Sequence, residues 1–240
     1  MADLHLHTAL SPCASREMTP PRIVREARER GLDLIAVCDH NSAGNAGSVQ
    51  RAAGGRPAVI AGMEITTREE VHVLGLFPSL DAALTAGERV LAGLPAGSGR
   101  PLKGEEQLLL DERGAVLGRE TRLLAAASSL SLGQALALIR AHGGLAVAAH
   151  LDRKAFSVLG QLGFLPAEAR FDALEVSAAG VARGRAPALA EYGLPLLASS
   201  DGHFPEDIGG ACTVLEAEEP SFAELVLALR GEGGRRCGIA

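Results

Sequence analysis

The sequence predicts an α/β fold in which helices cover a largely parallel sheet, either open or closed into a barrel. Short apolar runs alternate with amphipathic helical stretches along most of the chain, which is typical of strands joined by right-handed helical crossovers. The length of 240 residues suits one or two domains, and single-domain barrels reach this size. With 47% hydrophobic and 22% charged residues, the composition is that of a globular domain with a large core.

The first forty residues predict a strand, a helix and a second strand. Residues 3–7 alternate apolar and polar side chains, as a strand does. Thr19 is placed to cap a helix that has two prolines in its first turn and Gly31 just past its end. Residues 32–40 are an apolar run too short for a helix, so we expect a strand buried on both faces of the sheet.

The middle of the chain predicts two paired strands and then a looser segment. Residues 58–67 and 71–77 are strand-like, with a tight turn between them. A helix at 80–94, a loop at 95–101 and a hairpin at 107–118 follow. We interpret residues 80–130 as an insertion, containing this small helix and hairpin, in a single domain that spans 1–240.

The alternation of strands and helices resumes at Ser131. This residue and Gln134 form a capping-box pattern at the start of a helix that ends at Gly143. Further strands are predicted at 145–151, 171–177, 194–203 and 211–217, and a last helix at 221–230.

Charge and composition exclude several classes of partner. The chain has 23 basic and 29 acidic residues, a net charge of −6, and only 3% aromatic residues with no tryptophan. These values oppose an extended nucleic-acid surface and binding to an anionic membrane. Four scattered cysteines without a C-x-x-C pair, no secretory leader and no apolar run of about 18–20 residues lead us to expect a cytoplasmic protein.

Histidines and acids gather at the ends of the predicted strands. His5 and His7 are two residues apart on one strand, so their side chains project from the same face. Further strands end with or near Asp39 and His40, Glu64, His150, and Asp201 and His203, while His72 lies in the strand after Glu64. Because the carboxyl ends of parallel strands share one edge of a sheet, these side chains should meet there.

Such a cluster predicts a metal site. Each buried histidine or acid could instead be satisfied separately by backbone hydrogen bonds, which is the more frequent situation for any one of them. Separate hydrogen bonds do not explain why five strands deliver such residues to the same edge of the sheet, whereas a shared metal site does. Imidazoles and carboxylates, with at most one thiol, suit Zn, Fe or Mn, and so many ligands imply more than one ion.

Six ordered motifs carry a resemblance to a known family. They are HLHT at 5–8, CDH at 38–40, GMEIT at 62–66, VHVLG at 71–75, AAHLDR at 148–153 and SSDGH at 199–203. In this order they resemble the motifs of the PHP family, the polymerase and histidinol phosphatase domains. The resemblance implies a distorted (β/α)7 TIM-like barrel with a trinuclear metal centre at the carboxyl ends of its strands.

The resemblance also implies a ligand set for two or three divalent ions. One ion would be held by His5, His7, Glu64 and Asp201, a second by His40 and His203, and a third by Glu64, His72 and His150. Six residues after His7, where related sequences usually have histidine or an acid, this chain has Cys13. Cys13 is therefore a thiolate ligand that favours Zn or Fe, a bystander, or the mark of a weaker second site.

The implied activity is metal-dependent hydrolysis of a small phosphomonoester or a short phosphodiester by a metal-bridging hydroxide. Arg153 is a candidate clamp for phosphate, with Lys154 as a weaker one, although an arginine in a loop is more often a solvated surface residue. Asp39 would orient a ligand imidazole or relay a proton.

Two other activities remain open. An amidohydrolase-like enzyme would use the same ions on a C–N bond, but its usual carbamylated lysine is missing, since lysine occurs only at 103 and 154. The other is a non-catalytic, metal-binding regulatory domain. Against it, eight of the nine ligand positions implied by the resemblance have the residue usual in the family.

Overall fold

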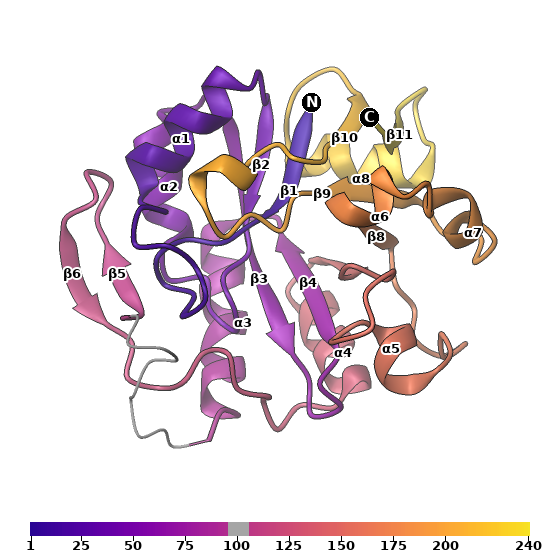
Figure 1. The fold of residues 1–240 in the computed structure, drawn as a ribbon, viewed down its shortest axis with the longest axis horizontal. Helices are drawn as coiled ribbons and strands as arrows, with labels where there is room; N and C mark the ends of the chain where they lie inside the picture. The colour runs from indigo at the N-terminus through magenta and orange to yellow at the C-terminus, as the bar shows by residue number, and fades with distance from the viewer. Residues whose placement is uncertain (96–105) are drawn as a thin grey trace.

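The computed structural model describes residues 1–95 and 106–240 and shows an α/β protein built on a nine-stranded sheet (Figure 1). The strands of this sheet are β1 (Ala2–Leu6), β2 (Leu34–Val37), β3 (Ala58–Thr66), β4 (His72–Phe77), β7 (Leu145–Ala148), β8 (Ala173–Ser177), β9 (Leu196–Ser199), β10 (Thr213–Glu216) and β11 (Arg236–Ile239). Their order in space is β11-β10-β1-β2-β3-β4-β7-β8-β9.

The sheet is less parallel than the sequence predicts. Its pairs β1–β2, β2–β3, β7–β8 and β8–β9 are parallel, whereas β3–β4, β4–β7, β1–β10 and β10–β11 are antiparallel. The reversal at β4 follows from the short turn after β3, because a parallel neighbour needs a crossover of a dozen or more residues. Thr66 consequently pairs with His72, so the start of β4 lies at the edge where β3 ends.

The two ends of the strand order approach each other. Leu6, at the end of β1, forms a parallel bridge with Gly202, and the His7 amide donates to the Gly202 carbonyl at 3.0 Å. From β10, the Thr213 hydroxyl donates to the Ala198 carbonyl at 3.0 Å and accepts from the Ala198 amide at 2.9 Å. The resulting nearly closed, barrel-like sheet confirms the predicted distorted TIM-like α/β fold.

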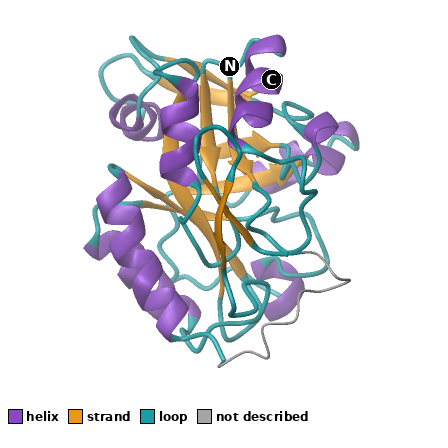
Figure 2. Ribbon diagram, turned by 90° about the vertical axis from the view of Figure 1, so that its left-hand side faces the viewer, coloured by secondary structure: helices purple, strands orange, loops and turns teal. Residues whose placement is uncertain are grey.

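Helices surround the strands, as Figure 2 shows. They are α1 (Pro20–Glu29), α2 (Ala46–Ala53), α3 (Leu80–Ala92), α4 (Leu132–Ala141), α5 (Val158–Leu162), α6 (Ala178–Ala182), α7 (Ala186–Ala190) and α8 (Phe222–Arg230), with a 3-10 turn at Pro205–Asp207. The predicted capping box of α4 is present, since Ser131 and Gln134 each accept the other's backbone amide. Helix α2 and strand β11 are elements that the sequence analysis missed.

Strand alternation divides the apolar residues between two cores. Leu4 packs with one buried cluster, formed by strand residues together with Leu225 and Leu229 of α8. Leu6, on the opposite face of β1, packs in a larger cluster with residues of helices α1 to α4. Both faces of β1 are therefore buried, as expected for a strand of an α/β barrel.

The predicted hairpin in the segment 80–130 is present as β5 (Leu108–Leu110) and β6 (Val116–Arg119). Asn45 fixes β5, because its side chain donates to the Leu108 carbonyl and accepts from the Leu110 amide, both at 2.9 Å. The hairpin is thereby joined to the loops around the carboxyl end of β1. The predicted loop at 95–101 lies, from residue 96 onward, outside the described residues.

Among the helices of residues 1–95 and 106–240, none has the length and apolar character needed to cross a membrane.

Candidate metal centre

Eight of the nine predicted metal ligands converge at one edge of the sheet with little exposure to solvent. The buried ones, in chain order, are His5, His7, His40, Glu64, His72, His150 and Asp201, and His203 is half-buried. Most follow strands that end at this edge, but His72 is the first residue of β4. The antiparallel direction of β4 brings this histidine to the others.

The first group of possible ligands comprises His5, His7, Glu64 and Asp201, whose ligand atoms all lie within 4.8 Å of one another. Asp201 Oδ1 is 3.3 Å from His5 Nε2 and 3.1 Å from His7 Nε2. Glu64 lies 3.5 Å from each of the same nitrogens through its two oxygens. The Nε2 atoms of His5 and His7 are themselves 3.2 Å apart.

Hydrogen bonds on the far side of these two rings identify the tautomers. His5 Nδ1 lies 3.1 Å from both oxygens of Glu175, so Nδ1 carries the proton. His7 Nδ1 lies 2.8 Å from Ser11 Oγ, and that hydroxyl donates its own proton to Asp39 Oδ1 at 2.7 Å, so His7 Nδ1 is also a donor. When both rings are neutral, as metal ligands must be, their Nε2 atoms face each other and two carboxylates, so these atoms can share one cation.

Glu64 also belongs to a second group of possible ligands, which comprises His40, Glu64 and His72. Its oxygens lie 2.9 Å from His40 Nδ1, 2.7 Å from His72 Nδ1 and 3.1 Å from His150 Nε2. The ligand atoms of His40, Glu64 and His72 lie within 4.8 Å of one another, so one ion could be bound by all three.

The histidines around Glu64 control its ionisation. Burial alone would raise the pKa of its carboxyl group. The nearby imidazoles of His72, His5 and His40 outweigh burial and hold this pKa well below its usual range. Glu64 is thus an ionised carboxylate in the interior, as a ligand shared by several ions must be.

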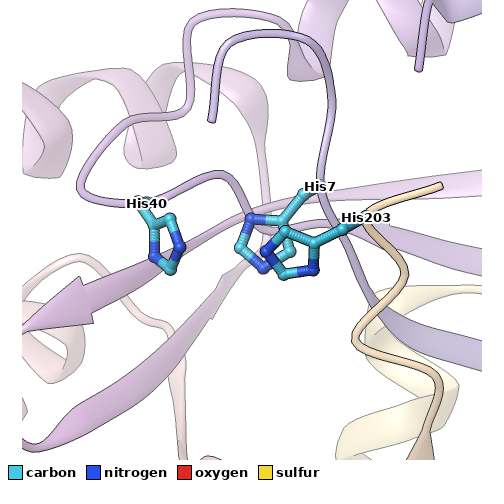
Figure 3. A group of neighbouring side chains, drawn as sticks. All are labelled: His7, His40 and His203. Carbon is cyan, nitrogen blue, oxygen red and sulfur yellow. The ribbon is translucent and has the colours of Figure 1, made fainter. Parts of the chain in front are cut away.

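The third group comprises His7, His40 and His203 (Figure 3). The rings of His7 and His203 are stacked with their centroids 4.1 Å apart. His203 Nδ1 donates to the Asp201 carbonyl at 2.8 Å, which leaves its Nε2 as the possible ligand atom. Together the three groups form one cluster of possible ligands, large enough for more than one ion, and their imidazoles and carboxylates fit divalent transition-metal ions.

Cys13 lies beside the third group. Its Sγ is 3.1 Å from His40 Nε2 and 3.1 Å from His203 Nε2, so the thiol bridges the two imidazoles. Burial would raise the pKa of this thiol, but hydrogen bonds from His203 and His40 lower it to about 7. The structure therefore places Cys13 where a ligand of the second predicted ion would be.

We expect Cys13 to be the fastest cysteine to react with iodoacetamide in chelator-treated protein. A pKa near 7 increases its thiolate fraction at neutral pH, and after correction for weaker nucleophilicity we expect about fivefold faster reaction than for an ordinary thiol at pH 7. Because burial raises the pKa of Cys38, Cys212 and Cys237, those thiols should react more slowly. Peptide mass spectrometry over a pH series measures each rate.

Added Zn²⁺ tests whether Cys13 is a metal ligand. A thiolate ligand is protected from alkylation as soon as metal binds. Unchanged alkylation of Cys13 in protein with a full complement of metal would exclude it as a ligand.

Two predicted ligands have strained backbones. His150 and Asp201 have φ values of 29° and 52°, in the left-handed region that residues other than glycine rarely adopt. Such conformations cost about 1–3 kcal/mol each and persist where the surroundings enforce them, commonly at functional sites. His150 and Asp201 lie two residues beyond the ends of β7 and β9, and their side chains contact Glu64 and His7.

The sequence analysis missed Glu175, which supports the site from within β8. The side chain is buried, contacts His5 Nδ1 through both oxygens and accepts the His150 amide at 2.8 Å. One carboxylate thus orients one predicted ligand and holds the backbone of another. An acid inside the apolar run 171–177 was the signal in the sequence, since a fully buried glutamate is rare without a partner.

Replacing Glu175 with glutamine should weaken metal binding about 10- to 100-fold, the usual effect of losing a carboxylate behind a ligand histidine. The amide can still accept from His5 Nδ1 but no longer supplies the negative charge. Titration of the chelator-treated protein with Zn²⁺ measures this affinity. The exposed Glu191→Gln serves as the control, and equal affinities in both variants would show that Glu175 has no supporting role.

The other predicted residues have distinct positions. Asp39 is fully buried and binds Thr8 and Ser11, so that it reaches His7 only through the Ser11 hydroxyl. Arg153 Nη1 lies 2.5 Å from Asp201 Oδ2, at the border of the site. Lys154 is exposed and belongs to none of the three groups of possible ligands. Lys103 lies outside the described residues.

Comparison with known proteins adds to this picture. Residues 185–232 match the family model described as PHP-associated. No curated protein matches the chain by sequence.

Several solved structures share the fold at low sequence identity. The lesion-specific endonuclease PfuEndoQ from Pyrococcus furiosus superposes with a TM-score of 0.69 and 20% identity over 98% of this chain, which spans 57% of the endonuclease. A protein from Bifidobacterium adolescentis assigned as a metal-dependent phosphoesterase has a TM-score of 0.58 and 18% identity, over 94% of this chain and 95% of its own. An amidohydrolase from Chromobacterium violaceum, crystallised with sulfate and no metal, has a TM-score of 0.59 and 23% identity, over 87% of this chain and 89% of its own.

The family model matches part of the sequence that contains the motif at 199–203, and the solved structures match the fold. The PHP-associated region contains α7, β10 and α8, which follow or flank the motif at 199–203. The resemblance to the PHP family is therefore confirmed, in a PHP-associated region and in a fold shared with Endonuclease Q and with a protein assigned as a metal-dependent phosphoesterase.

Proposed function

We propose that this chain is a metal-dependent phosphoesterase that hydrolyses small phosphomonoesters or short phosphodiesters. The observation that carries the proposal is the pair of Nε2 atoms of His5 and His7, which are 3.2 Å apart and lie within 4.8 Å of carboxylate oxygens of Asp201 and Glu64. Nitrogen and oxygen atoms that converge in this way are the ligands that divalent transition-metal ions bind.

Three sets of side chains would hold the ions. His5, His7, Glu64 and Asp201 would bind one, His40 and His203 with Cys13 a second, and Glu64, His72 and His150 a third. When bound, divalent ions lower the pKa of coordinated water and neutralise charge on a phosphoryl group. Ligand type favours Zn, Fe or Mn.

Arg153 would bind the phosphoryl group of the substrate. Its guanidinium contacts Asp201, so it lies next to the proposed ions, and its planar fork matches two oxygens of a phosphate. Burial alone would lower the pKa of Arg153, but the charge of Asp201 and their hydrogen bond raise it, so the group is always a cation. Asp39 would position His7 through Ser11, and this contact favours the orienting role over that of a proton relay.

The substrate is proposed to be a small molecule. The endonuclease that shares the fold is longer than this chain, which spans only 57% of it, and the net charge of −6 disfavours an extended nucleic-acid surface. We also propose a cytoplasmic location, from the arrangement of the cysteines.

The test combines metal analysis with a substrate panel. Protein purified anaerobically is analysed for Zn, Fe and Mn and assayed with p-nitrophenyl phosphate and other phosphate esters. We expect two or three ions per chain and phosphate release, both lost in the double variant His5→Ala, His7→Ala.

The same experiment can contradict the proposal. Stoichiometric metal without hydrolysis of any phosphate ester would exclude the phosphoesterase and favour an amidohydrolase or a regulatory domain. If protein that has been incubated with Zn, Fe and Mn still contains no bound metal, the proposed metal site does not exist.

A further inference from the structure

A cavity of about 500 Å³ opens next to the metal centre between the loop after β7 and the segment after β8. Four cationic side chains line it: Arg153, Lys154, Arg183 and Arg185. We call it the cationic pocket. Its volume falls in the range of small-molecule sites, roughly 300–1,000 Å³.

The protein offsets the charge of the cationic pocket only in part, because Arg153 pairs with Asp201. Among residues 1–95 and 106–240, no carboxylate forms an ion pair with Lys154, Arg183 or Arg185. The one acid in the lining, Asp152, is already bonded through both oxygens to the amide and hydroxyl of Ser177, at 2.8 and 2.7 Å. Four cations thus outnumber Asp152 in the lining and Asp201 at its border, and the pocket is positive in a chain with a net charge of −6.

Arg153 connects the cationic pocket to the metal centre. It lines the pocket and also contacts Asp201, a predicted metal ligand. An ester held at the centre would therefore extend its remaining part past Arg153 toward Lys154, Arg183 and Arg185. Guanidinium groups bind phosphate bidentately, so this part of the substrate should carry negative charge.

We infer that the cationic pocket binds a second phosphate of the substrate, whose other phosphate is hydrolysed at the metal centre. This inference rests on the proposed function and narrows its substrate class to small esters with two phosphate groups. The cations line one concave pocket of small-molecule size, which favours a small bisphosphate over a nucleic-acid strand.

Binding of inorganic phosphate tests the cationic pocket without catalysis. Isothermal titration of the metal-free protein is compared between the wild type and the double variant Arg183→Gln, Arg185→Gln. We expect phosphate affinity to fall at least about tenfold in this variant, because each charge-assisted bond to an ionised group contributes about 1.5–3 kcal/mol. The control Arg68→Gln, Arg89→Gln makes the same change in charge at exposed arginines elsewhere and should retain the wild-type affinity.

Paired substrates test the link to the active site. Sugar phosphates that differ by one phosphate, such as fructose 6-phosphate and fructose 1,6-bisphosphate, are compared by kcat/KM. We expect the bisphosphate to be preferred at least about tenfold by the wild type, and Arg183→Gln, Arg185→Gln to remove this preference, mainly through KM.

The outcomes separate the inference from the proposed function. Hydrolysis of monophosphates with no preference for bisphosphates, and equal phosphate affinity in wild type and pocket variant, would overturn the inference and leave the phosphoesterase intact. No hydrolysis of any ester would instead overturn the proposed function. Binding of single-stranded DNA that depends on both arginines, without any effect on phosphate binding, would also overturn the inference in favour of a nucleic-acid partner.

Discussion

Replacing Glu64 with glutamine is expected to abolish stoichiometric metal binding and to reduce phosphate release by more than about 100-fold. Loss of a residue behind a ligand costs about 10- to 100-fold, and Glu64 is itself a predicted ligand of two ions. Its two oxygens contact five imidazoles, those of His5, His7, His40, His72 and His150. A neutral amide cannot replace an anion at the centre of this group.

Elemental analysis and the phosphate-release assay measure both effects of Glu64→Gln. Circular dichroism shows whether the variant is folded, and the exposed Glu88→Gln is the matched control. A folded Glu64→Gln protein with the metal content and activity of the wild type would contradict the central position of this carboxylate.

Metal loading is expected to raise the melting temperature of chelator-treated protein by roughly 5–10 °C for each tightly bound ion. A ligand at 100 times its Kd stabilises the folded state by about 2.7 kcal/mol, and each kcal/mol raises Tm by about 2–4 °C in a chain of this size. The ligand residues come from distant parts of the sequence, so the unfolded chain should bind the ions far more weakly.

Differential scanning calorimetry with Zn²⁺, Mn²⁺ or Fe²⁺ checks this expectation. Mg²⁺ prefers oxygen ligands and should have a much smaller effect, and the His5→Ala, His7→Ala variant should lose most of the shift. Equal Tm values with and without transition-metal ions would show that the clustered side chains do not form a metal site.

The positions of the strand-end histidines explain why much of the site could be predicted. His5 and His7 share a face because of the two-residue period of a strand, and the parallel strands β2 and β9 bring His40 and Asp201 to the same edge. These are local rules that apply wherever the strands are correctly assigned. His72 lies at the same edge because β4 runs antiparallel to β3, so that β4 starts where β3 ends.

Other parts of the site depend on contacts that no local rule contains. Glu175 acts from the middle of β8, and its partner His5 is 170 positions away. Arg183 and Arg185 reach the cationic pocket from the short segment between α6 and α7, about 30 residues beyond Arg153. Helix α2 was missed because its eight residues include glycine and serine, which are weak helix formers.

The contact between β1 and the loop after β9 also dictates when the metal centre forms. His7 and Asp201 contact each other across 194 positions of the sequence. At about 5–20 residues per second, a ribosome needs roughly 10–40 s to synthesise the chain between them. During that time His5 and His7 have been synthesised but Asp201 has not, and contacts of such high sequence separation are slow to form. We therefore expect the ligand group of His5, His7, Glu64 and Asp201 to be completed only after β1 and the loop after β9 have come together.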